Sequence, residues 1–416
     1  MRIGIDCRSL MVRPYGERGG IEYYTHSLIK HLLKIDKENS YVLFFDHLVQ
    51  EKPYFEHPNV SIRYFPFSEY KRYLPFTYSH MLMAGFLQRE NLDIFHSPAH
   101  VVPLFYPGKS ILTIRNLAIF KHPEWFSKEY LPQFPSELLS RSLFTMKVLL
   151  PQSIKKAHSI ITFCDDTKQD IVKLFKVPAK RITVIYPGVD DDNLLDYDPL
   201  VDKMEIASRF GIVKDYIFYI GTIEQRKNLV GLVQAYYALL LEQPDLVRYQ
   251  LILAGEKGAK YDELFEAIDV CNKDLEKRGP IEWSRTVEET ERYAPIRYVG
   301  PISYEEKSLL LRNASVFVYP SLYESFCSTL LRAMRHEVPV IISRIKPLIE
   351  VAGSAAHYIN PSKVDDMRKA LHSVLEKNDL RERLIESGKS RSQKFQWQKA
   401  AEQTAQLYKQ VAKSRY

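Results

Sequence analysis

Two stretches of the sequence place charged residues at the start of a predicted helix, an arrangement suited to binding an anion. The first is GTIEQRKNL, residues 221–229, which directly follows a strand pattern and leads into a helical one. Gly221 allows the chain to turn close to a ligand. Arg226 has a planar guanidinium that can donate two parallel hydrogen bonds, and Lys227 has a compact ammonium charge. Together they are suited to binding a diphosphate. Because a helix start disfavours bases, these two indicate a compensating anion.

The second stretch is ESFCSTLLRAM, residues 324–334, which follows the strand pattern SVFVYP. The helix start should fall among the small polar residues Ser325, Cys327, Ser328 and Thr329. Free backbone N–H groups at a helix start, together with the positive end of the helix dipole, bind phosphate well. Glu324 has two interpretations at this point, a contact to the ligand or a helix cap.

The elements that must position these residues alternate along nearly the whole chain. Short apolar runs rich in β-branched residues predict buried strands at 2–6, 41–45, 93–96, 111–114, 159–163 and 182–186, and again at 216–221, 249–255, 296–300, 315–320, 339–343 and 357–360. Amphipathic stretches predict helices at 21–35, 144–157 (interrupted by Pro151), 228–243 and 363–377. The linker-like segment PGVDDDNLLDYDP separates the two series of strands.

This alternation predicts an α/β fold with two doubly wound parallel-sheet domains. Ligands bind such sheets at the carboxyl ends of the strands, and both anion-binding stretches follow a strand there. A dinucleotide-binding domain is disfavoured, because no G-x-G-x-x-G follows the first strand and Gly16, Gly19 and Gly20 are spaced differently.

Composition excludes several classes of protein. The four cysteines are scattered without a CxxC pair, which argues against zinc and a disulfide framework. Neither a signal peptide nor an apolar run of membrane-spanning length is visible, so we expect a cytoplasmic enzyme. Residues 1–188 carry 25 Lys and Arg against 17 Asp and Glu, whereas the remainder carries 33 against 34. The basic excess favours an anionic membrane surface or a phosphate-bearing substrate, the alternative being a solvated basic face.

Taken together, the residues resemble the retaining glycosyltransferases of family 4, which have the GT-B fold. In the second half the resemblance rests on GTIEQRKNL, LILAGEKG, IRYVGPIS, VYPSLYESFCSTLLRAMRHEVPVIIS and EVAGSAAHYINP. In the first half it rests on GIDCRSL, GGIEYYTHSL, DIFHSPAHVVPL and ILTIRNLAIFKHPEWF, and FQWQKAAEQTAQLY is similar to the family's closing helix. The resemblance is strongest to bacterial members acting on cell-envelope polysaccharides.

The resemblance implies two Rossmann-like domains facing across a cleft. Residues 1–188 would bind the acceptor, residues 189–395 the nucleotide sugar, and residues 396–416 would form a helix that crosses back to the first domain. It further implies transfer of a sugar from a GDP- or UDP-sugar with retention of anomeric configuration, without a metal or other cofactor. We expect the acceptor to be a growing, lipid-linked bacterial surface glycan.

The resemblance also assigns roles to residues. Arg226 and Lys227 match the pair that binds the diphosphate, and Glu324 matches the first acid of the E-x7-E motif near the donor sugar. The remaining expected donor contacts are the backbone of Ser325, Phe326, Cys327, Ser328, Thr329 and Leu330, the glycine loop at Gly19 and Gly20, Gly221, and Gly300 with Pro301 beside the base. Arg226, Lys227 and the helix start would stabilise the charge on the leaving oxygen.

Three departures from the family pattern matter, the least of them Glu22, which follows GGI where a glycine is common. Arg332 replaces the second acid of the motif, which in the family binds the ribose hydroxyls. An arginine lacks acceptors for those hydroxyls, so Arg332 would instead pair with Glu324 or reach a phosphate. Arg115 and Asn116 stand where the family usually has His-Asp beside the reacting sugar. Arg115 would then add a catalytic cation that helps the leaving group or an anionic acceptor.

On the acceptor side, His96 and His100 in HSPAH follow a predicted strand and are expected to line the acceptor cleft with Asn116. The alternative for each histidine is a packed or solvated side chain. Residues 70–88, aromatic and apolar with leading bases, predict either a buried helix or a peripheral membrane contact.

Two functions follow from these patterns. The first is an active glycosyltransferase that extends an envelope glycan. The rival, motivated by Arg115 and Arg332, is a catalytically degenerate subunit with the same fold that binds a glycan or a partner protein. The retained Arg226, Lys227 and Glu324 oppose the rival.

Overall fold

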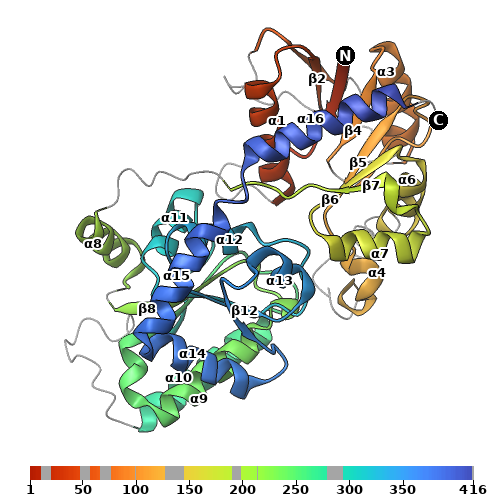
Figure 1. Ribbon diagram of the computed structural model, residues 1–416. Helices are drawn as coiled ribbons and strands as arrows, with labels where there is room; N and C mark the ends of the chain where they lie inside the picture. Colours follow the sequence, from red (N-terminus) through yellow and green to blue (C-terminus); the bar gives the residue numbers. More distant parts are fainter. Residues whose placement is uncertain are drawn as a thin grey trace. The chain divides into compact units, whose positions relative to one another are not determined.

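The structure, a computed structural model, describes residues 1–10, 20–46, 57–65, 76–98, 100–126, 145–189, 198–212, 214–278 and 294–414. The chain divides into two compact units (Figure 1). Unit 1 comprises residues 1–188 and 396–416, and unit 2 comprises residues 189–395. The expected Gly19 contact lies outside the described residues.

Unit 1 contains a seven-stranded parallel sheet in the order β3-β2-β1-β4-β5-β6-β7. Its strands are β1 (Arg2–Asp6), β2 (Ser40–Phe45), β3 (Val60–Tyr64), β4 (Ile94–Ser97), β5 (Ser110–Ile114), β6 (Ser159–Thr162) and β7 (Ile182–Val184). Its helices are α1 (Gly20–Ile35), η2 (Thr77–Leu82), α3 (Met83–Arg89), α4 (Ala118–Lys121), η3 (Pro123–Phe126), η4 (Thr145–Leu149), α6 (Leu150–Lys156), α7 (Asp165–Phe175), η5 (Ala179–Arg181) and α16 (Trp397–Lys413).

Unit 2 contains a six-stranded parallel sheet in the order β10-β9-β8-β11-β12-β13. Its strands are β8 (Asp215–Ile220), β9 (Tyr249–Ala254), β10 (Ile296–Tyr298), β11 (Val316–Tyr319), β12 (Val340–Ser343) and β13 (His357–Ile359). Its helices are α8 (Pro199–Phe210), η7 (Gln225–Lys227), α9 (Leu229–Glu242), η8 (Pro244–Arg248), α10 (Asp262–Arg278), α11 (Tyr304–Arg312), α12 (Ser328–Arg335), α13 (Lys346–Ala352), α14 (Val364–Glu376) and α15 (Asn378–Ser392).

Two parallel α/β sheets confirm the predicted fold class, and each of the twelve predicted strands is present. Pro151, predicted to interrupt its helix, is the second residue of α6, which directly follows the π-helical turn η4, so the helical stretch changes its geometry beside the proline and continues. The prediction missed β3, whose sequence VSIRY carries a serine and an arginine. As an edge strand it stays only partly buried and needs no continuous apolar run.

Strand order reverses direction once in each sheet. In unit 1 the chain moves outward from β1 to β2 and β3, then returns to β4 on the other side of β1. In unit 2 the corresponding neighbours are β8 and β11. Crevices form outside the carboxyl ends of strands at such switch points, so both units offer a ligand site there.

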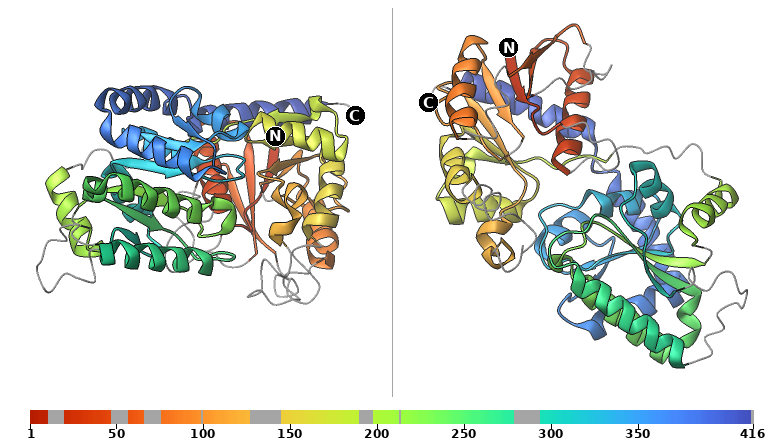
Figure 2. Two further views of the ribbon diagram at one scale, coloured as in Figure 1. Left: turned by 90° about the horizontal axis from the view of Figure 1, so that it is seen from below. Right: turned by 180° about the vertical axis from the view of Figure 1, so that it is seen from behind.

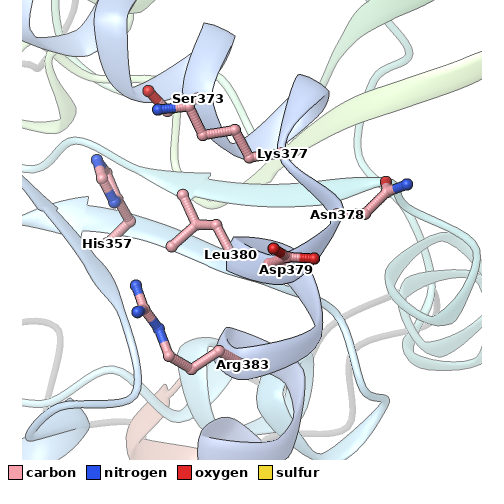
Figure 3. Close-up of a pocket in the computed structure, with 7 residues that line it drawn as sticks. All are labelled: His357, Ser373, Lys377, Asn378, Asp379, Leu380 and Arg383. Atoms are coloured by element: carbon pink, nitrogen blue, oxygen red, sulfur yellow. The ribbon is translucent and has the colours of Figure 1, made fainter.

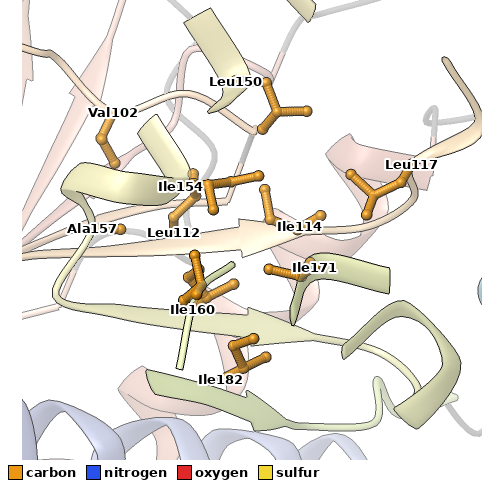
Figure 4. Packing of buried hydrophobic residues seen from close by; sticks show 11 residues of the cluster. Val102, Leu112, Ile114, Leu117, Leu150, Ile154, Ala157, Ile160, Ile171 and Ile182 are labelled. Carbon is orange, nitrogen blue, oxygen red and sulfur yellow. The ribbon is translucent and has the colours of Figure 1, made fainter. Parts of the chain in front are cut away.

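The core beneath β5 fixes the end of that strand. Ile114 and its neighbours pack under α6 and α7 in one apolar cluster (Figure 4). The cluster consists of Val102, Leu112, Ile114, Leu117, Leu150, Ile154, Ala157, Ile160, Ile171, Val177 and Ile182. Because side chains alternate along a strand, Thr113 and Arg115 face the opposite side of the sheet from Leu112 and Ile114.

The last helix, α16, belongs to unit 1, where it packs beside α1 and on β4 (Figures 1 and 2). Trp397 at its start is buried and lies against the rings of Tyr23, Tyr24 and His31. A side chain at Gly188 would collide with the backbone of Trp397, so only glycine allows this close approach. In the described ranges, no helix combines the length and apolar character needed to cross a membrane.

Candidate functional site

The predicted anion-binding residues of unit 2 meet at the switch point between β8 and β11. Gly221 and η7 follow β8, and the loop carrying Glu324 follows β11, so the parallel pairing of the two strands brings both stretches to one edge of the sheet. We call Glu224, Arg226, Lys227, Tyr319 and Glu324 the charged cluster.

Lys227 is at the centre of the charged cluster and is almost entirely buried, with 5% of its surface exposed. Its Nζ donates to Glu324 Oε1 and, at 2.8 Å, to the Oη of Tyr319. The same ammonium lies 4.9 Å from the centre of the Tyr319 ring. Burial raises the pKa of Tyr319, so its hydroxyl is neutral and can accept from the lysine.

Arg226 joins the two acids of the charged cluster. Its Nη2 lies 2.6 Å from Glu224 Oε1, and its Nη1 lies 3.6 Å from Glu324 Oε1. The Nη1 group also donates to the carbonyl of Tyr323 at 3.4 Å. Burial alone would lower the pKa of Arg226, but Glu324 and Glu224 outweigh it and raise the pKa.

Glu324 is buried and ionised. Burial acts to raise the pKa of its carboxyl, but Lys227 and Arg226 outweigh burial and hold the pKa below its ordinary value. The residue that caps α12 is Cys327, whose Sγ accepts from the N–H of Leu330 at 3.4 Å. The helix-cap interpretation of Glu324 is therefore wrong, and its contacts are with the two bases.

The start of α12 provides fewer free amides than expected. The N–H of Leu330, expected to contact the donor, is occupied by Cys327 Sγ, which corrects that prediction. The N–H groups of Ser328 and Thr329 lie in the first turn, where the helix itself offers no acceptor. Ser325 is buried, and the ring of Phe326 packs 6.2 Å from that of Phe395.

Glycines bring neighbouring loops of unit 2 close together. Gly255, after β9, adopts φ +133°, and a side chain there would collide with the backbone of Gly221. Its N–H donates to the carbonyl of Gly300 at 2.9 Å. Gly300 has φ +88° with open space where a Cβ would be, and Pro301 beside it is exposed. The expected base-binding position is thus an open one at the carboxyl ends of these strands.

Arg332 is 3% exposed and contacts an aromatic residue. Its Nη2 donates to the Oη of Tyr304 at 2.7 Å, and its Cζ lies 4.4 Å from the centre of the same ring. Tyr304 is the first residue of α11, three residues after Pro301. The guanidinium therefore joins α12 to the start of α11.

In unit 1, Arg115 lies at the end of β5 under the start of α1. A Cβ added to Gly20 would lie 2.5 Å from Nη2 of Arg115, so the lack of a side chain at position 20 leaves room for the guanidinium. Burial lowers the pKa of Arg115 to about 10. His100 adopts φ +67° in the turn after β4, and burial, then Arg115, lower the pKa of its ring to about 3. The side-chain carbonyl of Asn116 accepts from the N–H of Ala118 at 3.3 Å.

The expected role of His96 in the acceptor cleft is wrong. The residue is fully buried, and both of its ring nitrogens are bonded within the protein, to Tyr408 Oη at 2.7 Å and to Thr113 Oγ1 at 2.8 Å. Burial lowers its pKa to about 3, so the ring stays neutral. His96 is a structural residue that fastens α16 to the sheet.

Sequence reasoning missed several residues of these sites. Glu224 stands two positions before Arg226, where a salt-bridge partner could have been noticed from the spacing. Tyr319 ends a strand, and Tyr304 begins a helix more than twenty residues from Arg332, so nothing local marks either as a partner of a charged residue.

A separate cavity of about 560 Å³ opens at the other end of the unit 2 sheet (Figure 3). The cavity is lined by His357, the first residue of β13, and so lies at the amino end of that strand. The charged cluster lies at the carboxyl ends of β8 and β11 in the same parallel sheet. Its lining residues are His357, Ser373, Lys377, Asn378, Asp379, Leu380 and Arg383. None of the predicted site residues lines this cavity.

Comparison with known protein families identifies both halves of the chain. Residues 205–391 match the family described as glycosyl transferases group 1, and residues 18–193 match Glycosyltransferase Family 4. The first match includes the charged cluster, and the second includes Arg115 and the start of α1.

Individual relatives agree with the family matches. The chain is 30% identical over 321 residues to O-antigen chain mannosyltransferase B of Escherichia coli, covering 76% of this chain and 74% of that protein. It is 24% identical over 271 residues to the D-inositol 3-phosphate glycosyltransferase of a Nocardioides species, covering 62% of this chain and 55% of that protein.

Solved structures share the fold across the whole chain. Anabaena Alr3699/HepE in complex with UDP and glucose superposes with a TM-score of 0.65 at 14% identity, covering 99% of this chain and all of that one. The trehalose-6-phosphate protein of E. coli bound with UDP-2-fluoro glucose gives 0.68 at 13%, covering 99% of both chains. With two parallel sheets and these matches, the chain belongs to the group 1 glycosyl transferases and is a glycosyltransferase with the GT-B fold.

Proposed function

We propose that the protein transfers mannose from a nucleotide diphosphate sugar, a GDP- or UDP-sugar, to a hydroxyl of a bacterial surface glycan. Transfer retains the anomeric configuration and uses no metal or other cofactor. The sugar and the class of acceptor rest on the 30% identity to an O-antigen chain mannosyltransferase. The single observation that carries the proposal is the charged cluster, whose two bases lie at the switch point of unit 2, where β8 and β11 end.

Loss of the nucleotide diphosphate builds negative charge on the leaving phosphate oxygen. Arg226 and Lys227 supply cations there, and the N–H groups of Ser328 and Thr329 supply donors at the positive end of α12. These groups are held in place before the substrate arrives, because Glu324 and Tyr319 fix the lysine and Glu224 fixes the arginine. Preorganised donors of this kind each contribute about 100- to 1000-fold in rate.

The same cations support the metal-free proposal. A metal ion in diphosphate chemistry neutralises charge and orients the leaving group, and Arg226 and Lys227 already provide both.

In the retaining reaction, the acceptor hydroxyl forms its bond to the anomeric carbon on the face that the leaving phosphate vacates. The bond from that carbon to the phosphate oxygen breaks, and the hydroxyl proton passes to a leaving phosphate oxygen. We assign no enzyme nucleophile to this step. Arg226 and Lys227 stabilise the phosphate as the bond breaks, and the ionised Glu324 holds them beside it.

The direct test is turnover with a panel of donors. The purified protein is incubated with GDP-mannose, UDP-glucose and UDP-galactose, and release of free nucleotide diphosphate is measured by chromatography. We expect release from GDP-mannose in the wild type and a loss of about 1000-fold in Lys227→Ala. When a mannoside acceptor is included, NMR of the glycoside product should show the anomeric configuration of the donor. No release and no thermal stabilisation by any donor would support the rival, a degenerate binding subunit.

We also propose that unit 1 contacts an anionic membrane surface, which would bring it to a lipid-linked acceptor. Helices η2 and α3 bury one face, which corresponds to the buried-helix alternative, and leave Phe76, Met81 and Leu82 exposed. Phe105 is 57% exposed, and its ring lies 6.5 Å from that of Phe76. The basic excess of residues 1–188 would add electrostatic attraction.

Cosedimentation with vesicles tests the membrane proposal. We expect the protein to bind vesicles containing anionic lipid, and the double substitution Met81→Ser with Phe105→Ser to reduce bound protein several-fold, because apolar contact is lost. Leu200→Ser is the matched control, since Leu200 is 75% exposed but lies in unit 2. Equal binding by the double variant and the wild type would rule this surface out.

A further inference from the structure

The cavity at the amino end of β13 is lined by side chains that are not bonded to the rest of the protein. All of its lining residues except Leu380 are polar or charged, namely His357, Ser373, Lys377, Asn378, Asp379 and Arg383. Within the described part of the chain, none of these polar side chains forms a hydrogen bond or an ion pair. The cavity volume of about 560 Å³ falls within the roughly 300–1,000 Å³ range of small-molecule sites. The cavity is therefore large enough for a small polar ligand and has groups to bind it.

The basic side chains of the cavity end on one side of Leu380 in the view of Figure 3. Lys377, one helical turn after Ser373, extends towards it, and the ring of His357 and the guanidinium of Arg383 lie on the same side. Lys377 and Arg383 both act electrostatically on His357, in agreement with this arrangement. These three basic residues, which we call the basic side of the cavity, come from β13, the end of α14 and the start of α15.

Positive charge exceeds negative charge around His357. Burial is the main cause that lowers the pKa of this ring. Asp366 acts to raise the pKa, whereas Arg344, Arg383 and Lys377 lower it further. Three cations therefore act on the ring against one carboxylate. An anion on the basic side of the cavity would offset this excess and would stabilise the protonated form of His357.

The other side of the cavity offers hydrogen-bonding groups without positive charge. Asn378 and Asp379 lie on the opposite side of Leu380 from the basic side chains (Figure 3). Asp379 is in the first turn of α15, where the helix dipole stabilises a carboxylate. Its carboxylate can accept hydrogen bonds from hydroxyl groups, and the amide of Asn378 can both donate and accept. The same carboxylate repels a second anionic group, so this side is suited to the hydroxyls of a sugar.

We infer that this cavity is a second ligand site of unit 2, which binds a sugar phosphate that carries no nucleotide. The phosphate lies on the basic side, where Arg383 can hold two of its oxygens at once and Lys377 adds a compact charge. The sugar hydroxyls lie towards Asn378 and Asp379. The site is at the amino end of β13, away from the charged cluster at the carboxyl ends of β8 and β11. The inference goes beyond the proposed function and does not depend on it, because binding here requires no sugar transfer.

Titration of mannose 6-phosphate into histidine-labelled protein, followed by NMR, tests the site. The resonances of His357 are those that disappear from the spectrum of His357→Gln. Millimolar mannose 6-phosphate should move them and should raise the pKa of the ring, because the anion offsets the neighbouring cations. Inorganic phosphate should bind at least about 10-fold more weakly, because the hydrogen bonds of the sugar hydroxyls are missing. Mannose alone, which has no charge for the basic side, should leave His357 unmoved.

Two variants test the basic side directly. Arg383→Gln and Lys377→Ala should each weaken the binding of mannose 6-phosphate about 10-fold, because each loses a charge-assisted hydrogen bond. Both side chains are exposed, so both variants should unfold at the same urea concentration as the wild type. Arg381→Gln is the matched control, since it removes the same charge from the same helix at a position that does not line the cavity. It should bind mannose 6-phosphate like the wild type.

Several results would overturn the inference. One is a His357 resonance that mannose 6-phosphate does not move, and another is equal affinity of Arg383→Gln and Arg381→Gln. Inorganic phosphate that binds as tightly as mannose 6-phosphate would contradict the sugar. GDP that moves His357 in Lys227→Ala would make the cavity a nucleotide site. Failure of the proposed function is a separate result, an absence of nucleotide binding and turnover, and leaves the response of His357 to mannose 6-phosphate intact.

Discussion

At the scale of single residues, the charged cluster keeps two acids and two bases in largely dry surroundings, where each charge depends on the others. Glu324 is the most dependent, because burial opposes its ionised form and only Lys227 and Arg226 maintain it. Removing one charge of such a group leaves the opposite charge buried and uncompensated. The cluster is therefore both a stability element and the proposed leaving-group site.

Glu324→Gln should reveal this dependence. The substitution keeps the shape of the side chain but leaves Lys227 without its carboxylate, so the free energy of unfolding should fall by about 3 kcal/mol, measured by urea denaturation. Glu263→Gln, on the exposed surface of α10, is the control and should change it by less than about 0.5 kcal/mol. A Glu324→Gln variant as stable as this control would show that the pairing contributes nothing.

The protonation of His96 should lower the free energy of unfolding of unit 1 at acidic pH. The folded pKa of His96 is about 3, below the ordinary value of about 6.5. As the pH falls below 6.5, the unfolded chain takes up the proton first, so the stability present at neutral pH is lost towards pH 3. The loss approaches about 1.4 kcal/mol per pH unit for this one group.

His96→Gln removes the titrating imidazole. The slope of unfolding free energy against pH should therefore become shallower between pH 6 and 4, by up to about 1.4 kcal/mol per pH unit. His122→Gln is the control, because the side chain of His122 is 33% exposed at the surface. The substitution at position 96 also breaks two hydrogen bonds, so the slope and not the stability at pH 7 is the measurement. Parallel slopes for the wild type and His96→Gln would contradict the buried, neutral assignment.

At the scale of helices and strands, α16 contributes an anchor to unit 1 through Trp397, which packs against Tyr23, Tyr24 and His31. Because α1 begins at Gly20, beside Arg115, the packing of α16 on α1 also supports the position of Arg115. A substitution at Trp397 should therefore also disturb the surroundings of Arg115, although the two residues are far apart in the sequence.

Trp397→Ala should lower the unfolding free energy of unit 1 by about 3–5 kcal/mol, since a large buried ring is lost. Urea denaturation followed by circular dichroism measures it. Lys399→Ala, an exposed position on the same helix, should have an effect within about 0.5 kcal/mol. If the two variants unfold at the same urea concentration, α16 is not an anchor of this unit.

Strands and helices were the most predictable part of the fold, for a physical reason. The buried strands of a parallel sheet are nearly continuous apolar runs, so RIGID and SIITF can be recognised as strands from the sequence. The edge strand β3 escapes notice because only one neighbour and little burial define it. The role of His96 was predicted wrongly, because the sequence shows that the residue is near the end of a strand but not which face of the sheet its side chain occupies. The side chain lies on the face that is covered by Tyr408.

The candidate site was predictable in its residues but not in its contacts. Arg226, Lys227 and Glu324 each follow a strand, yet their meeting depends on β8 lying beside β11, which no local pattern states. The pairing of Arg332 with Tyr304 is similarly set by the packing of α11 near α12. Sequence reasoning identified Arg332 as a departure, and the structure supplies its partner.

At the scale of the whole molecule, unit 2 carries Arg226 and Lys227 at the switch point of its sheet, whereas unit 1 carries Arg115 at the end of β5, one strand away from the switch point between β1 and β4. In unit 2 acids balance them, whereas in unit 1 Arg115 has no acidic partner among the described residues. This difference agrees with the uneven distribution of charge, in which the basic excess falls in residues 1–188.

The central claim is that the charged cluster holds the diphosphate of the nucleotide sugar. Isothermal titration of GDP and UDP into the wild type and Lys227→Ala tests it most directly, with Lys377→Ala, at the separate cavity, as the matched control. We predict that one nucleotide binds the wild type and the control equally and that Lys227→Ala weakens it at least about 100-fold. Equal affinity for Lys227→Ala and the wild type would contradict the claim.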